Sequence, residues 1–261
     1  MISFGREILD FIPFWTWALI LTRFAGVFIA LPGIGTEQIP SSFKYWAALA
    51  LSLALASTGI RAKEPAHFME LALMLSSEFM FGYVIGAIPS FIVAGAAVAG
   101  QAVAGTIGLA QANMIDVSLG GSVAVLSRIK ALFTTAVFLA IDGHHAVIRA
   151  ATMTSDTISL GVFRPDALVA EVLLNQLVMS FQMALAIAAP VLITSLITQF
   201  VLGLISKFVP QLNIFLITMP LLLLVGLYVV EHTLPSIRDV VVERFEDTGT
   251  ALEIVLNHQS P

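Results

Sequence analysis

The stretch FLAIDGHH at residues 138–145 holds the densest group of side chains that could do chemistry. Asp142, His144 and His145 could ligate a metal or form a catalytic base pair. Adjacent histidines on a helix point about 100° apart, however, and the chain has no H-E-x-x-H pattern and no other histidine at ligand spacing. We therefore favour a structural turn over a metal or catalytic site, with a subunit contact as the remaining alternative. In that turn Gly143 would end one helix in a left-handed conformation, and Asp142 or the following polar residues would satisfy backbone groups at the next helix start.

A second polar group, EFMFGYVIG, places Glu78, Gly82 and Gly86 on one helical face. A Gly-x-x-x-Gly pair lets two helices approach closely, and a carboxylate beside it in lipid is costly unless it is paired. Tight packing with Glu78 near a helix end is the plain interpretation. A buried contact with a partner chain and a proton relay are the alternatives.

Arg23 interrupts the first apolar run of the chain. A lone arginine in the middle of a membrane helix costs several kcal/mol on insertion scales. Arg23 must therefore face protein or water, or the segment is not a plain transmembrane helix.

Prolines and amides mark the last two apolar runs. Proline removes a backbone donor and bends a helix, and neighbouring amides can bond the freed carbonyls or reach another chain. Two such helices joined at a lysine predict a bent hairpin shaped to wrap around a partner. The residues concerned are Pro190, Lys207, Pro210, Gln211 and Asn213.

The segment from Thr106 to Ser122 combines apolar and amide side chains with paired glycines. Irregular backbone at membrane depth is tolerated only inside protein or lining a cavity, and soft apolar side chains can close a pore by packing. We expect either a pore plug or an ordinary external loop. The candidate plug residues are Thr106, Ile107, Leu109, Gln111, Asn113, Met114, Ile115 and Asp116.

The composition indicates a membrane-associated protein. The 261 residues are 58% hydrophobic and 11% charged, with a mean hydropathy of +0.97, whereas soluble domains carry roughly 25% charged residues. A net charge of −5 offers no basic face for nucleic acid. The absence of cysteine excludes a thiolate nucleophile and a cysteine-ligated zinc.

Charged residues separate the apolar runs, and each run predicts a helix. After Glu231 the chain becomes charged, with apolar residues at helical spacing, which predicts an amphipathic, water-exposed tail. The expected helices are Ile12–Leu31, Tyr45–Ile60, from near Phe68 to about Gly105, from Val123 or Ala131 to Ile141, from near Ala146, across the charge-free run after Glu171, and Phe208–Val230.

The chain resembles the FliR family, the flagellar biosynthetic proteins of the bacterial type III export gate. The resemblance is carried by LFTTAVFLAIDGHHAVIRA, by APVLITSLITQFVLGLISKFVPQLNIF and by the opening MISF. It covers the chain to about Glu231, and DGHH points to the flagellar branch. One departure is Asp116–Val117, where the family pattern leads us to expect Asp-Pro.

The resemblance implies an all-α membrane-associated fold of kinked helical hairpins. It implies a FliP-like part at residues 1–165 with a plug loop near 106–122, a FliQ-like hairpin at 166–230 and a polar tail at 231–261. The implied partners are FliP-like and FliQ-like gate subunits, the FlhB and FlhA components, and exported unfolded flagellar proteins, in a hetero-oligomer. The implied location is the export apparatus of the flagellar basal body in the bacterial inner membrane.

The resemblance further implies a structural, non-enzymatic subunit without cofactor or metal. In such an assembly neighbouring subunits would shield Arg23 and Glu78. Two other functions compete with this reading. A small-solute secondary transporter would need two related halves with polar residues at the midplane, and a membrane hydrolase would use Asp142, His144 and His145.

Overall fold

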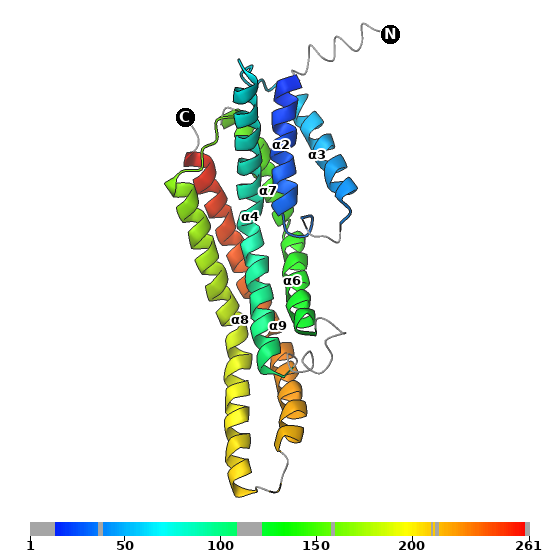
Figure 1. Ribbon diagram of the computed structural model, residues 1–261, viewed down its shortest axis with the longest axis vertical. Coiled ribbons are helices and arrows are strands. Elements are labelled where there is room, and N and C mark those ends of the chain that lie inside the picture. Colours follow the sequence, from blue (N-terminus) through cyan, green and yellow to red (C-terminus); the bar gives the residue numbers. More distant parts are fainter. Residues whose placement is uncertain are drawn as a thin grey trace. The chain divides into compact units, whose positions relative to one another are not determined.

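A computed structural model of the chain describes residues 14–35, 39–108, 122–157, 160–209, 211 and 214–258 (Figure 1). These residues form helices and their connections, and none of them belongs to a strand. The predicted all-α fold is confirmed. The helices are α2 (Phe14–Ala30), α3 (Ser41–Ala56), α4 (Phe68–Thr106), α6 (Ser122–Ala140), α7 (Gly143–Thr157), α8 (Ala167–Phe208) and α9 (Ile214–His258).

Three of the described helices, α4, α8 and α9, are long and apolar enough to cross a membrane. Helices α6 and α7 meet at a bend of 63° and would add a fourth crossing if they form one broken span. Helix α2 is apolar but shorter. Length and composition therefore agree with the predicted membrane association.

Helix α9 differs most from its prediction. The sequence predicts a helix ending near Val230 and a separate tail, but α9 runs without a break through Pro235 to His258. Most of the apolar stripe of this tail is buried: Val241 is fully buried and Ile237 and Phe245 are 6% exposed, whereas Leu234 is 40% exposed. Burial of that stripe offsets the roughly 3 kcal/mol that an internal proline costs, so the stripe packs instead of facing water.

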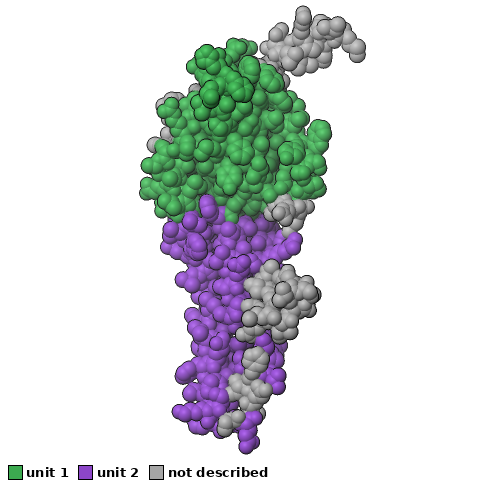
Figure 2. Space-filling model, in the orientation of Figure 1, with its two compact units in different colours: residues 1–90, 138–176, 245–261 green, residues 91–137, 177–244 purple. Residues whose placement is uncertain are grey.

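The chain packs as two compact units, coloured separately in Figure 2. Unit 1 comprises residues 1–90, 138–176 and 245–261, and unit 2 comprises residues 91–137 and 177–244. Helices α4, α6, α8 and α9 each contribute to both units. These units are defined by packing. The predicted division near residue 165 instead concerns likeness to other gate subunits, so it stays a prediction.

Small residues allow the helix backbones of unit 2 to approach one another closely. A Cβ atom added at Gly95 of α4 would lie 2.6 Å from the carbonyl oxygen of Ser180 of α8. One added at Gly100 would lie 2.6 Å from Cα of Ser127 of α6. Ser127 also donates its hydroxyl to the carbonyl of Ala97 at 2.9 Å. The run AGAAVAGQAVAG is therefore the contact surface of α4 for two neighbouring helices.

Candidate functional site

An ion pair lies in the interior of unit 1. Nε of Arg23, on α2, donates to Oε2 of Glu78, on α4, at 2.6 Å. Each side chain is only 1% exposed. A buried pair at this distance is a charge-assisted hydrogen bond, which is stronger than one between neutral groups.

The remaining polar atoms of the pair bind other segments of unit 1. Oε1 of Glu78 accepts the backbone N–H of Gly161 at 2.6 Å, and Nη1 of Arg23 donates to the carbonyl of Ala151 at 3.2 Å. The guanidinium carbon of Arg23 lies 4.9 Å from the centre of the Phe81 ring. Two charges thus connect α2, α4, α7 and the segment before α8.

The glycine face of α4 packs against α2. A Cβ atom at Gly82 would collide with the carbonyl oxygen of Arg23, and one at Gly86 would lie 2.7 Å from that of Val27. Gly26 of α2 is equally constrained, because its Cβ would lie 2.8 Å from the backbone nitrogen of Tyr83. The close approach brings the arginine within reach of the carboxylate.

This geometry corrects the expectation that neighbouring subunits shield Arg23 and Glu78. Each charge is neutralised by the other and buried within its own chain. The physical reason is the glycine contact, which no single apolar run reveals, since the two residues stand 55 positions apart. Sequence reasoning named both charges but missed Gly26, Phe81 and Gly161 as their surroundings.

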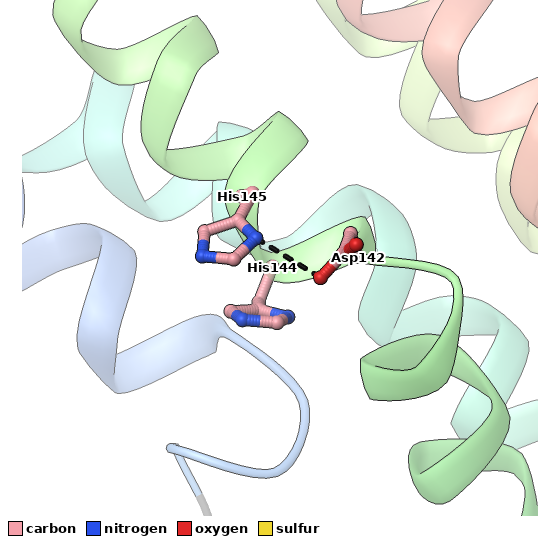
Figure 3. Close-up of side chains that lie close together, drawn as sticks. All are labelled: Asp142, His144 and His145. Carbon is pink, nitrogen blue, oxygen red and sulfur yellow. Dashed lines mark hydrogen bonds and ion pairs between the residues drawn. The ribbon is translucent and has the colours of Figure 1, made fainter.

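The DGHH motif forms the bend between α6 and α7 (Figure 3). Asp142, with a φ of 58°, is the only non-glycine residue with positive φ in the described part of the chain. Its carbonyl accepts the N–H groups of His145 at 2.9 Å and of Ala146 at 3.3 Å. The left-handed residue is therefore Asp142 and not Gly143, which corrects the prediction.

Two local causes explain this arrangement. Aspartate tolerates the left-handed region better than most residues. Gly143 instead begins α7, where a Cβ atom would collide with the ring of Phe138 and lie 3.1 Å from its carbonyl oxygen. The glycine is thus required by close packing, while the aspartate provides the turn.

The two histidines lie beside this turn. Nδ1 of His145 is 3.1 Å from Oδ1 of Asp142, and both side chains are largely exposed. A dashed line marks this contact in Figure 3. The rings of His144 and His145 lie 4.1 Å apart between centres. One ligand atom from each of the three residues lies within 4.8 Å of the others. The described residues place no fourth histidine or carboxylate in this group, and the contact of His145 with Asp142 has a structural use in closing the bend.

Only the beginning of the candidate plug belongs to the described residues. The other plug residues, Leu109, Gln111, Asn113, Met114, Ile115 and Asp116, lie outside them. Thr106 ends α4 and donates its hydroxyl to the carbonyl of Val103 at 2.9 Å. Ile107 follows and is fully buried. Its side chain lies against Gly226 of α9, where a Cβ atom would collide with Cγ2 of Ile107.

Gly226 is a residue that sequence reasoning missed. It interrupts the apolar run LLLLVGLYVV inside α9. An isolated glycine in a helical pattern costs about 1 kcal/mol relative to alanine, which is a signal for a close contact. That contact attaches the first residue after α4 to α9 within unit 2.

The C-terminal hairpin leaves most of its surface uncovered by the chain itself. In an apolar stretch of 18 residues in each helix, only 28% of the residues of α8 and 11% of those of α9 are buried. Pro190 lies inside α8, and Thr194 donates its hydroxyl to the Pro190 carbonyl at 2.8 Å. Lys207 and Gln211 are exposed, whereas Pro210 and Asn213 lie outside the described residues.

The described residues form helices and connections only, with a largely uncovered apolar hairpin and a buried Arg23–Glu78 pair. These features are typical of an integral membrane subunit whose apolar surface other molecules cover. The family model described as "Bacterial export proteins, family 1" matches residues 14–248. The chain therefore belongs to this family of bacterial export proteins.

Three relatives named "Flagellar biosynthetic protein FliR" are similar to the chain over most of its length. That of Aquifex aeolicus (strain VF5) is 28% identical over 248 residues, which are 94% of this chain and 96% of the relative. That of Caulobacter vibrioides is 25% identical over 88% and 92% of the two chains. That of Escherichia coli (strain K12) is 26% identical over 89% and 88%. The predicted FliR resemblance is confirmed, and nothing in these matches supports a small-solute transporter.

Proposed function

We propose that this chain is a structural subunit of the flagellar type III protein export gate, which helps to form and plug the channel for unfolded flagellar proteins. The family match over residues 14–248 carries the proposal, because it covers both compact units and the hairpin. The relatives bear a flagellar biosynthetic name. The subunit acts by shape and packing and not by catalysis.

The bare hairpin supports assembly with other gate subunits. Its exposed apolar side chains form a surface that would aggregate in water and that fits other apolar helices. We propose FliP-like and FliQ-like subunits as direct neighbours, with FlhB and FlhA as further components, in the bacterial inner membrane at the flagellar basal body. Examples of the exposed side chains are Ile193, Leu196, Ile197, Phe200, Leu216, Leu224 and Tyr228.

The plug is proposed for residues 106–122. Its support is the anchored start of the segment: Ile107 is buried against Gly226 directly after α4. A segment held at its base can be placed reproducibly across a channel, while soft side chains such as Met114 close it.

Co-expression tests the assembly. The chain, produced with FliP-like and FliQ-like subunits in detergent, should elute as one complex that contains all three proteins. Produced alone, it should aggregate or be degraded. A monodisperse, folded chain that ignores its co-expressed neighbours would contradict the proposal.

Shortening the segment tests the plug. Removing part of residues 109–121 in the assembled gate should increase the leak of small solutes from vesicles or cells. A deletion of equal length between α3 and α4, at residues 57–67, serves as the control and should leave the gate closed. A tight gate after the first deletion, in a complex of normal mass, would reject the plug assignment.

A further inference from the structure

Lys130 is a buried cation to which no described residue of the chain bonds. It lies on α6 and is 6% exposed, and its Nζ atom has no hydrogen-bond partner in the part of the chain that the structure describes. Thr134, one turn further along α6, is 1% exposed, and its hydroxyl also lacks a partner. Residues four positions apart share a helical face, so the two side chains leave α6 on the same side.

The missing partner needs an explanation, because an unpaired buried ammonium is costly. Removing an ammonium from water without giving it a partner is strongly unfavourable, and charged side chains within apolar helices commonly mark functional contacts. Hydroxyls elsewhere in the apolar helices are satisfied locally. Thr194 and Thr198, for example, donate to the carbonyls of Pro190 and Thr194 at 2.8 Å, whereas Thr134 makes no such bond.

The charge in this part of unit 2 is of one sign. Within residues 91–108 and 122–137, Arg128 and Lys130 are the only charged residues, and both are cations. The described carboxylates elsewhere in unit 2, Glu231, Asp239 and Glu243 of α9, are exposed, and none of them bonds Lys130. The complementary group is therefore an anion from elsewhere. A carboxylate fits, because it accepts hydrogen bonds from an ammonium and a hydroxyl at the same time.

The outer face of α6 is open to a neighbour. Val125 and Ile129 are each 55% exposed, and Leu132 is 46% exposed. Lys130 stands next to Ile129 in sequence, and its long flexible stem can carry Nζ from the interior to this apolar face. A partner helix packed there brings its side chains within reach of the ammonium.

We infer that Lys130, with Thr134 beside it, receives a carboxylate side chain from a neighbouring gate subunit when the chain is assembled. The inference rests on the proposed gate function and specifies one contact within it. The carboxylate compensates the buried charge and fixes the register of the partner helix on α6.

Zero-length cross-linking tests the contact in the co-expressed complex. A water-soluble carbodiimide should join the amine of Lys130 to a carboxylate of another subunit, and peptide mass spectrometry should identify both residues. The product should disappear in Lys130→Met and persist in the matched control Lys63→Met, a lysine that is 82% exposed and precedes α4. A link to a carboxylate of the same chain, or a reproducible absence of any Lys130 link, would overturn the inference.

The dissociation rate of the complex gives the second readout. Lys130→Met should change this rate in different directions if Lys130 is paired across the interface and if it is unpaired. If Lys130 is paired across the interface, Lys130→Met should speed dissociation at least about tenfold, since truncating one partner of a buried charge pair is strongly unfavourable. Thr134→Val should act in the same direction more weakly. If Lys130 is unpaired, Lys130→Met removes a buried charge and leaves dissociation unchanged or slower, which would reject the contact. A wild-type chain that forms no complex would instead refute the proposed function itself.

Discussion

Arg23 and Glu78 show how two charges become compatible with an apolar interior. Each loses its hydration, and the loss is offset by a 2.6 Å bond between them and by bonds to Gly161 and Ala151. Replacing such a pair with apolar residues is often neutral, but removing one member leaves an uncompensated charge. The pair therefore makes the position of α2 on α4 specific more than it makes the chain stable.

Glu78→Gln should destabilise the chain by about 3–5 kcal/mol, because it leaves the Arg23 guanidinium buried beside a neutral amide. Thermal or denaturant unfolding of the purified complex measures the change. The double substitution Arg23→Met with Glu78→Met should recover most of the loss, since no buried charge remains.

Glu70→Gln on the same helix is the matched control for Glu78→Gln. Glu70 is 34% exposed and lies 3.6 Å from the exposed Lys63. Water screens an exposed pair of this kind, so its loss should cost much less than the loss of the buried pair. Equal losses for Glu78→Gln and Glu70→Gln would show that the buried pair has no special role.

Asp142→Val should destabilise the bend between α6 and α7, because a β-branched residue at a φ of 58° costs about 1–2 kcal/mol. Asp142→Asn should be nearly neutral, since asparagine tolerates this region and keeps an acceptor for His145. Unfolding midpoints of the two variants provide the comparison. If both variants behave alike, backbone conformation is not what selects Asp142.

At the scale of elements, glycines decide which helices touch. Gly26, Gly82 and Gly86 bring α2 and α4 to backbone contact in unit 1, and Gly95 and Gly100 do the same for α4 in unit 2. One helix thus uses two glycine faces for different partners. The sequence predicted the first face at Glu78, Gly82 and Gly86, but it did not indicate that the partner helix is α2 of the same chain.

Gly82→Ala and Gly105→Ala should shift stability in opposite directions, although both lie on α4. The new methyl group at Gly82 collides with the carbonyl of Arg23, and overpacking of this kind costs about 1–3 kcal/mol. At Gly105 the added atom meets nothing within 4 Å, so the higher helix propensity of alanine should add about 0.5–1 kcal/mol. Melting temperatures of the two variants decide; a stabilising Gly82→Ala would exclude the close contact.

At the scale of the whole molecule, the chain leaves apolar helix surfaces that its own residues do not cover. Its interior charges are satisfied within unit 1, but the α8–α9 hairpin and the outer face of α6 are left bare. Bare apolar helices are stable only against lipid or other subunits. The anchored start of the plug segment on α9 connects this surface with the proposed closure of the channel.

Gly226→Ala should loosen that closure, because the added methyl group collides with the fully buried Ile107 and displaces the base of the plug segment. The assembled gate should then leak ions, which flux from loaded vesicles measures. Gly249→Ala, on the same helix α9, adds an atom that meets nothing within 4 Å and should leave the flux unchanged. If the Gly226→Ala gate leaks no more ions than the wild type, the contact between Ile107 and Gly226 does not contribute to closure of the channel.

The sequence by itself determined where the helices lie, since charged residues and turns interrupt apolar runs at local spacing, and it determined the family through FLAIDGHH and the APVLITS run. Only the tertiary structure showed which distant residues are in contact: Arg23 with Glu78, and Ile107 with Gly226. It also showed that the predicted tail continues α9 and buries its apolar stripe. Asp142 adopts the left-handed conformation, because Gly143 begins α7 at a position where Phe138 leaves no room for a Cβ atom. Hydropathy and turn propensity are properties of neighbouring residues, whereas the pairing of charges and the placement of glycines depend on which helices meet.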